Sequence, residues 1–560
     1  MSERVLAALA ERYWQWTRRE FPLTAVMAGQ PNDDAVMFRE APADFDRRAV
    51  EAAALLGELD AIALASLDVA DRATHRLLRR ELDDLCAFHR LGAHQRPWLL
   101  PVGPEFNTVF FANLSSVGDA DSARRYADRL ATLPAFFADV VANLRAGLAR
   151  GFRYPRVVIE RAEGNVRASV AAPDDALPWF GPFKRSVAIG SPAVQAQAER
   201  AKALIAERIV PALSALADVM RDELAPQARD SIACTDDPMG RESYQRWVQH
   251  FTTTELSPDQ IHELGVSEAL RIETEIERVA ADAGYPNDVP AYRRFIAADP
   301  QFVAASADAL RERVAVIAKR IDRLIPSYFG RVPRITYGVE SIPPAFASRM
   351  PPAYAQPNPG DGSTSGILWV SGIPSMCPLY LVPSLALHEG WPGHLMHLAL
   401  MQEAEALPSF RRFNAVKYTA CLEGWALYCE GLGEEMGLYQ TPHQRFGRLD
   451  MELWRALRLV VDTGIHWKGW SRDRAIHEMT SRLSLSRETI EGEVDRYIAL
   501  PAQALAYQVG NLKFRELRVR AQATQGERFK LRNYHDMLMA AGPVTLPVLD
   551  DTVQAWLAAA

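Results

Sequence analysis

Apolar and polar residues are spaced along most of the chain as they are on the two faces of a helix. Apolar side chains recur three or four positions apart with charged residues between them, which is typical of amphipathic α-helices. Residues suited to cap a helix, such as Asp119 and Ser257, precede several of these segments. The pattern predicts helices over 2–20, 46–66, 71–91, 119–150, 192–225, 257–284, 302–324, 378–405, 409–436, 441–467, 471–482, 486–507, 510–525 and 546–558.

Signals for β-strands are few. Short β-branched runs predict strands over 156–160, 335–340 and 366–370, and the Pro- and Gly-rich run 351–366 predicts a surface loop before the last one. That strand, just ahead of the helix at 378–405, could offer an open edge to an extended peptide or could serve only the fold. The expected fold class is therefore mostly α, with a small β element.

No strong boundary divides the 560 residues. The chain has no long Ser/Gly linker, charge block, low-complexity tract or convincing internal repeat. We therefore expect one continuous helical body, with an N-terminal helical region over 1–240 and a region carrying the candidate chemistry over 241–560.

Composition excludes several classes of protein. A net charge of −7 leaves no basic field to hold nucleic acid. The five cysteines are odd in number and show no C-x-x-C spacing, which argues against a disulfide framework. The first helix turns amphipathic at once, unlike a signal peptide, and no apolar run approaches the roughly 18 residues of a membrane span. A cytoplasmic protein without a membrane partner is expected, and the sequence leaves its oligomeric state open.

The stretch His388-Glu389-Gly-Trp-Pro392-Gly393-His394 is the strongest chemical signal. In the related motif H-E-x-x-H, two histidines one helical turn apart bind Zn²⁺ and the Glu activates the metal-bound water. Here the second His comes two residues late, so a regular helix would turn it away from the first. Since Pro392 has no N–H for the helix and Gly393 tolerates unusual dihedral angles, we expect a bulge that brings the histidines together.

Two other His-Glu pairs serve as internal controls. His262 and His477 are each followed by Glu, but no second His comes soon after, and both lie in polar helical stretches. They are interpreted as solvated helix faces. The segment around His388 is apolar instead, and buried ionisable groups need partners. A metal site is favoured over the alternative, a core cluster of histidines that satisfy one another.

A third ligand is expected from the segment CLEGWALYCEGL. Glu423 lies there among apolar residues, which suits a ligand from a facing helix. Two His and one carboxylate would leave the fourth position of a tetrahedral zinc for water. Glu430, seven residues later on the same face, is the rival ligand, or else an acceptor that orients a His N–H.

Further polar residues downstream are candidates for the same site. Asp462 and His466 are four residues apart in an apolar helix, where the pair could orient a donor or only tie helices together. Tyr507 and Gln503 lie one turn apart, and either could donate to the oxyanion of a tetrahedral intermediate. Arg518 could clamp a substrate carboxylate, or could be a surface residue of an amphipathic helix.

Six segments form a recognisable set: H-E-G-W-P-G-H, the preceding G-I-L-W-V, E-G-W-A-L-Y, R-L-V-V-D-T-G-I-H, P-A-Q-A-L-A-Y and Y-H-D-M-L-M-A-A-G. In these segments, and upstream over nearly its whole length, the chain resembles the bacterial domain-of-unknown-function family 885. That family is similar to the zincin-type peptidase clan of thimet oligopeptidase, angiotensin-converting enzyme and thermostable carboxypeptidases. The resemblance implies a large helical zincin-like fold, with His388, His394 and Glu423 at the metal positions and Glu389 as general base.

Three residues depart from the usual pattern of that family. His397 stands where Gln is common, Gln508 where a Lys often follows the Tyr, and Tyr534 where Phe usually precedes His-Asp. His397 is three residues after His394, so it could compete as a ligand or bond to one. Gln508 weakens any role for a lysine in neutralising an oxyanion or a substrate carboxylate.

Two classes of function follow. The first is a zinc-dependent hydrolase that cleaves amide bonds of short peptides or peptide-like metabolites, with Glu389 activating the water and His466 and Tyr507 assisting. Hydrolysis of a non-peptide amide is a variant of this class. The second is a non-catalytic helical binding protein that keeps the fold. Side-chain preference, the end that is trimmed and the oligomeric state are not encoded in any readable pattern.

Overall fold

Helices make up 73% of the computed structural model, and a small three-stranded sheet accompanies them, so the predicted fold class is confirmed. The structure describes residues 2–29, 36–171, 177–342, 347, 350–413 and 417–559. The chain divides into two compact units: Met1–Tyr244 with Asp495–Pro501, and Gln245–Val494 with Ala502–Ala560. In the described residues, no helix has the length and apolar character needed to cross a membrane.

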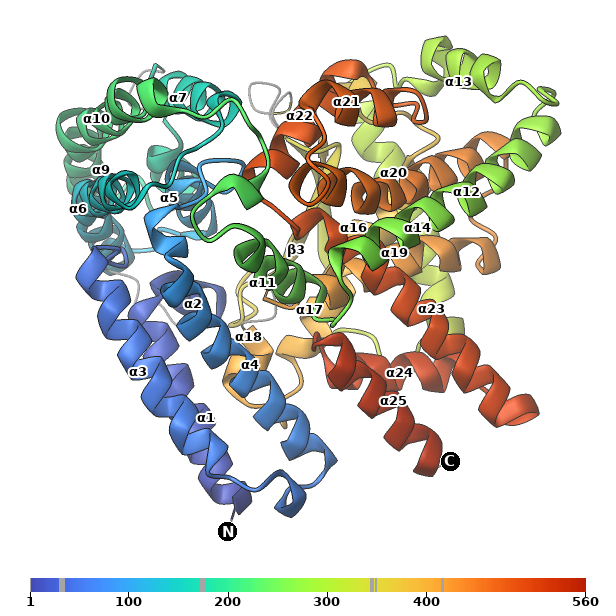
Figure 1. The fold of residues 1–560 in the computed structure, drawn as a ribbon, viewed down its shortest axis with the longest axis horizontal. Coiled ribbons are helices and arrows are strands. Elements are labelled where there is room, and N and C mark those ends of the chain that lie inside the picture. Colours follow the sequence, from blue (N-terminus) through green and yellow to red (C-terminus); the bar gives the residue numbers. More distant parts are fainter. Residues whose placement is uncertain are drawn as a thin grey trace. The chain divides into compact units, whose positions relative to one another are not determined.

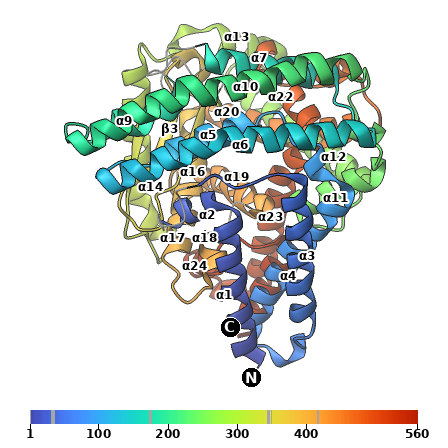
Figure 2. The same cartoon turned by 90° about the vertical axis from the view of Figure 1, so that its left-hand side faces the viewer.

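The first unit is built from helices. Figure 2 shows α6 lengthwise beside α9 and α10, while α3 packs along α4. Asp119 caps α6 as predicted, since its carboxylate accepts the backbone N–H of Ser122 at 2.8 Å. The helices of this unit are α1 Ser2–Glu20, α2 Pro22–Met27, α3 Pro42–Asp60, α4 Val69–Leu91, α5 Pro104–Leu114, α6 Ala120–Arg150, α7 Arg156–Val170, α8 Gly181–Arg185, α9 Pro192–Leu204, α10 Val210–Val219 and α11 Gly240–Thr252, whose last turns enter the second unit.

The second unit contains the sheet and the remaining helices (Figure 1). Ser257 caps α12 as predicted, and its hydroxyl accepts the N–H of Gln260 at 3.2 Å. The helices are α12 Pro258–Asp282, α13 Val289–Ala298, α14 Ala307–Tyr328, α16 Val382–Glu389, α17 His394–Gln402, α18 Ser409–Phe413, α19 Thr419–Glu435, α20 Pro442–His466, α21 Arg472–Thr480, α22 Arg487–Ala499, α23 Ala506–Gln525, α24 Leu531–Ala541 and α25 Leu546–Ala559; the last turns of α22 belong to the first unit.

Two helix pairs of this unit approach closely at glycines. A Cβ on Gly510 of α23 would lie only 1.9 Å from the carbonyl oxygen of Ala420 in α19. A Cβ on Gly265 of α12 would lie 2.6 Å from the Cβ of Leu459 in α20. Only glycine permits such contacts between backbones. The segment carrying Glu423 is therefore held directly against α23.

The sheet has the order β1-β3-β2. Strand β3, Gly366–Ser371, pairs in parallel with β1, Tyr337–Ile342, and antiparallel with β2, Ala353–Gln356. Two of the three predicted strands are thus present. Of the two roles left open for the strand ahead of 378–405, the open edge is ruled out, because β3 is paired on both sides. The predicted surface loop over 351–366 contains β2, which the Pro and Gly around it concealed.

The predicted strand over 156–160 is also wrong, because these residues begin helix α7. The buried residues Val158, Ile159, Ala162 and Val166 of α7 follow helical spacing beyond the β-branched run. The helix predicted over 486–507 ends early at Ala499, and Ala502 adopts a positive φ of 68° before the chain enters α23. Tertiary packing thus overrides local propensity in both segments.

Candidate metal centre

The chain between the two motif histidines breaks the helix. Helix α16 ends at Glu389 and α17 begins at His394, so the predicted interruption between the histidines is present, but as a turn that joins two helices and not as a bulge within one. A Cβ on Gly393 would lie 1.9 Å from the carbonyl oxygen of His388. The turn therefore folds back onto the end of α16, and glycine is needed for that close approach.

This turn is fixed by α19. The indole N–H of Trp425 donates to the carbonyl oxygen of Pro392 at 2.8 Å, and Trp425 is fully buried. The ring also packs edge-on against His397. Because Glu423 lies two residues before Trp425 on the same helix, one bond sets the position of the turn relative to the candidate third ligand.

The two histidines and Glu423 meet at one point. The rings of His388 and His394 are 4.8 Å apart at 89° to each other. The Nε2 atoms of His388 and of His394 each lie 3.4 Å from Oε2 of Glu423. Atoms bound to one tetrahedral Zn²⁺ at about 2.0–2.2 Å lie about 3.3–3.5 Å apart. The distances from both histidines to Glu423 therefore fit ligands that share a zinc ion.

Glu430 contacts the opposite side of His388. Its Oε1 lies 2.8 Å from Nδ1 of His388, and the side chain is buried. A carboxylate accepts, so Nδ1 carries the proton and donates it. This contact directs Nε2 of His388 toward His394 and Glu423. Glu430, the rival third ligand, thus lies where it orients a histidine.

The charges in this cluster stabilise one another. Burial alone would lower the pKa of His388, but its contacts with Glu423 and Glu430 raise that pKa to about 10. Burial would raise the pKa of Glu423, but the charge of His394 and the bonds from both histidines lower it well below its usual range. Since a ligating His must be neutral, a metal ion would displace the proton on Nε2 of His388.

Glu389, the last residue of α16, lies beside the ligand set. One ligand atom from each of His388, Glu389 and His394 lies within 4.8 Å of the others. Burial raises the pKa of Glu389, against the opposing effect of the two histidines. A raised carboxyl pKa moves toward neutrality, where a group that must both take and return a proton is most effective.

His397 remains apart from the donor atoms. It is 1% exposed, and neither ring nitrogen has a hydrogen-bond partner. Burial lowers its pKa to about 3, helped by the charge of His394. His397 is therefore a neutral ring packed in the core beside Trp425.

The downstream candidates lie around the C-terminal half of α20. Both carboxylate oxygens of Asp462 accept the backbone N–H of Ala502, at 3.1 and 3.0 Å. This bond fixes the turn ahead of α23, from which Gln503 and Tyr507 come. His466 is fully buried at the end of α20. The catalytic role of His466 and Tyr507 and the substrate contact of Gln503 stay predictions.

Arg518 already has partners. Its guanidinium donates to both oxygens of Glu435 at 2.7 and 2.8 Å, and to the hydroxyl of Tyr428 at 3.3 Å. That hydroxyl also contacts Nε2 of the buried His535 at 2.8 Å. Arg518 thus takes part in a network behind α19, and its predicted role as a substrate clamp stays a prediction.

Gln508 and Tyr534, which depart from the family pattern, have partners within the second unit. The side-chain amide of Gln508 donates to Glu268 at 3.1 Å and accepts from Asn511 at 3.2 Å. A side chain at position 508 therefore faces a carboxylate of α12. Tyr534 is fully buried next to His535.

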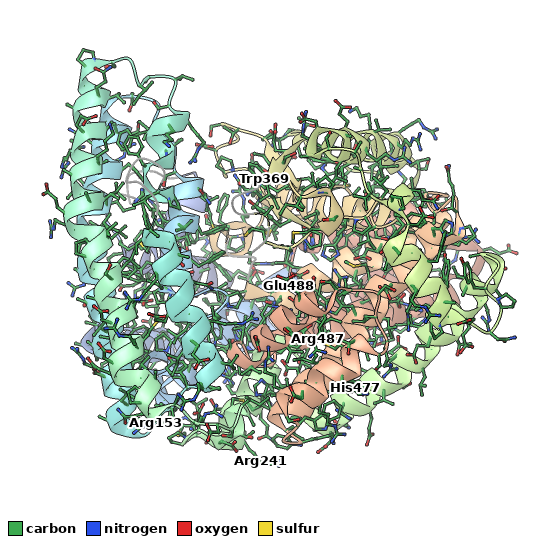
Figure 3. All side chains as sticks on the ribbon, turned by 90° about the horizontal axis from the view of Figure 1, so that it is seen from above. Arg153, Arg241, Trp369, His477, Arg487 and Glu488 are labelled. Atoms are coloured by element: carbon green, nitrogen blue, oxygen red, sulfur yellow. The ribbon has the colours of Figure 1, made fainter. Side chains whose placement is uncertain are left out.

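The two control pairs differ from each other. Figure 3 labels His477 on α21, and this residue is exposed, as interpreted from the sequence. His262 is half-buried instead, and its Nδ1 lies 2.8 Å from the hydroxyl of Thr463 on α20. The interpretation of His262 as solvated is wrong, because α12 packs along α20.

The sequence interpretation missed Arg455 and Trp425 as parts of this site. Arg455 lies on α20 with 5% exposure, and Nη2 is 4.0 Å from Oε1 of Glu430. A signal was present, since an arginine in the apolar run around 453–461 needs a buried partner.

Replacing Trp425 by Phe is expected to lower the free energy of unfolding by about 1–3 kcal/mol, because the buried carbonyl of Pro392 loses its donor. Chemical denaturation of both proteins measures this loss. The control is Trp369→Phe on β3 (labelled in Figure 3), where the indole donates to Gln356 in a part-buried place and water can replace it. Equal losses in the two variants would contradict the assignment.

The chain was compared with known proteins. A family model described as "Bacterial protein of unknown function (DUF885)" matches residues 22–553. The crystal structure of a candidate lipoprotein from Colwellia psychrerythraea is 25% identical, with 100% of both chains covered and a TM-score of 0.93. The structure of a candidate lipoprotein of unknown function from Shewanella oneidensis is 18% identical over 99% of each chain, with a TM-score of 0.71, which shows the fold alone. A comparison with curated proteins finds no match. Because the family model takes in almost the whole sequence, the chain belongs to the DUF885 family of bacterial proteins.

Proposed function

We propose that the protein is a zinc-dependent hydrolase that cleaves amide bonds of short peptides or peptide-like metabolites. The observation that carries the proposal is the position of Glu423, whose Oε2 is 3.4 Å from the Nε2 atoms of both His388 and His394. Two imidazoles and one carboxylate are a donor set typical of catalytic zinc sites, which keep one coordination position open. Glu430 on the far nitrogen of His388 supplies the acceptor that such sites usually have.

The chemistry divides between the ion and the chain. Zn²⁺ held by these residues would acidify a water molecule and polarise the scissile carbonyl. Glu389 accepts a proton from that water on its carboxylate and returns it to the nitrogen of the leaving amine. Its raised pKa favours the first of these two steps, because a more basic carboxylate takes a proton from the water more readily.

Tyr507 and His466 are the candidates to donate to the developing oxyanion, and Gln503 and Arg518 are the candidates to contact the substrate. The bond from Ala502 to Asp462 supports this grouping, since it ties the turn before Tyr507 to α20, which ends at His466. A cytoplasmic location and the absence of a nucleic-acid or membrane partner are part of the same proposal.

The test combines metal analysis with turnover. The purified chain is assayed for bound metal and incubated with a library of short peptides, with and without a chelator, and cleaved products are scored by mass spectrometry. We expect about one zinc per chain and cleavage that the chelator abolishes and added Zn²⁺ restores. Bound zinc without cleavage of any peptide would favour the alternative of a non-catalytic binding protein. Cleavage of non-peptide amides alone would show that the substrates are not peptides.

Glu423 and Glu430 are expected to differ as zinc contacts. Glu423→Gln removes a donor and should weaken zinc binding by several orders of magnitude, whereas Glu430→Gln should weaken it roughly 10- to 100-fold. Competition with a zinc-binding dye measures both affinities, and each glutamine keeps the shape of the acid it replaces. A larger loss in Glu430→Gln would transfer the ligand role to Glu430.

A further inference from the structure

Behind the candidate metal centre, two buried groups of opposite charge each have one polar atom without a hydrogen bond. Oε2 of Glu430 and Nε of Arg455 are both buried without a hydrogen bond in the structure. Glu430 is 1% exposed and Arg455 is 5% exposed. An ionised group buried without compensation costs several kcal/mol, so such atoms call for a partner.

The two groups are neighbours. The nearest atoms, Nη2 of Arg455 and Oε1 of Glu430, are 4.0 Å apart, beyond hydrogen-bond length but within the range of a direct ion pair. Nη1 of Arg455 donates to the carbonyl oxygen of Met451 at 3.2 Å. The edge formed by Nε and Nη2, which suits a carboxylate with two oxygens, therefore has the Glu430 carboxylate as its ion-pair neighbour.

Packing holds the arginine in place. Its guanidinium lies 5.0 Å from the ring centroid of Trp454, and burial lowers the pKa of Arg455 while the charge of Glu430 raises it. Arg455 also senses the charge of Glu423. A small movement of the Glu430 carboxylate toward α20 would satisfy both unpartnered atoms at once.

We propose that Arg455 is a positioning residue for the metal centre, forming a two-bond ion pair with Glu430 that holds the Nδ1–H contact of His388 in place. The order of contacts is then Arg455 to Glu430 to His388, with Nε2 of His388 directed at Glu423. The inference rests on the proposed zinc site. It adds a part of the site that lies on α20, outside both motif segments.

The chain offers a matched control. Arg458 lies three residues later on α20, is 4% exposed and stacks on the same Trp454 ring at 4.5 Å. Its Nη2 donates to Glu493 at 3.1 Å, and its guanidinium lies 4.4 Å from the ring centroid of Tyr507. Removing this arginine also removes a buried cation from α20, but it leaves Glu430 untouched.

The experiment is a double-mutant cycle on zinc affinity, which requires no turnover. Dissociation constants for Zn²⁺ are measured for the parent chain, Arg455→Met, Glu430→Gln and the double variant. Each single variant should bind zinc roughly 10- to 100-fold more weakly. The double variant should be no weaker than the worse single one, because both changes break the same contact.

Further measurements separate positioning from general destabilisation. The absorption spectrum of the Co²⁺-loaded protein should change in Arg455→Met and stay unchanged in Arg458→Met, although both should lose stability. Arg455→Lys keeps the positive charge but cannot form two parallel hydrogen bonds, so it should weaken zinc binding less than Arg455→Met. If Arg455→Met does not fold, Arg455→Lys replaces it in the cycle.

Three results would overturn the inference. Unchanged zinc affinity in Arg455→Met and Arg455→Lys would show that Arg455 does not position the site. Losses of affinity that multiply in the double variant would show that Arg455 and Glu430 act independently. An equal loss in Arg458→Met would show a general effect of α20. Zinc binding by the parent chain, which the first proposal requires, is measured in the same series, so failure of the zinc site itself is distinguished from failure of Arg455 alone.

Discussion

The Glu389→Gln protein is expected to keep its fold and its zinc while cleaving peptides roughly 10²- to 10⁴-fold more slowly than the parent chain. Glutamine has the shape of glutamate but cannot take a proton from water at neutral pH. Glu389 lies at the end of α16 beside His388 and His394, within 4.8 Å of their ligand atoms, so its loss removes a base and leaves the donors in place.

The same preparation should be assayed for zinc content, melting temperature and cleavage rate. Glu263→Gln is the control, because Glu263 also follows a histidine, His262, but is exposed on α12. A carboxylate that merely braced the helix would change the melting temperature and leave the rate nearly intact. A folded, zinc-loaded Glu389→Gln protein that cleaves at the parent rate would rule out the proposed mechanism.

His388→Ala and His394→Ala are each expected to weaken zinc binding by several orders of magnitude. Ligands act together, so removing either imidazole leaves two donors that hold the ion poorly. The Nε2 atoms of both histidines are equidistant from Oε2 of Glu423, which predicts similar losses for the two variants.

Metal content after dialysis measures these losses, and His477→Ala is the control because His477 is exposed on α21. His397→Ala provides a sharper comparison. This ring is buried next to the site but contributes to the core, so its removal should lower stability and leave zinc affinity within a few-fold of the parent. Full occupancy in both His388→Ala and His394→Ala would contradict the ligand set.

Helical periodicity predicted most long helices because their apolar faces repeat over many turns. The predicted helices over 2–20 and 441–467 agree with α1 and α20 within one residue at each end. Local composition was misleading in short segments, where only a few residues indicate whether the chain forms a helix, a strand or a loop. The β-branched start of α7 suggested a strand, and the four-residue β2 was hidden in a loop of Pro and Gly.

In the candidate site, too, features set by local sequence were predicted, and features set by packing between helices were not. Motif spacing and the chemistry of Pro392 and Gly393 predicted that the helix must be interrupted, but not that it ends and restarts, because that depends on the bond from Trp425. The place of Glu430 behind His388 requires the distance between two helices. Sequence spacing within one helix carries no such information, so the apolar surroundings of Arg455 indicated that it needs a buried partner but not that this partner is Glu430.

The segment Asp495–Pro501 belongs to the first unit although about 250 residues separate it from Tyr244. Its Asp495 is buried and pairs with Arg161 of α7 at 2.8 Å. During synthesis at about 5–20 residues per second, the ribosome would need roughly 10–50 s after residue 244 to deliver this segment. The first unit therefore cannot be completed as it emerges. Its last segment is made only after most of the second unit has left the ribosome.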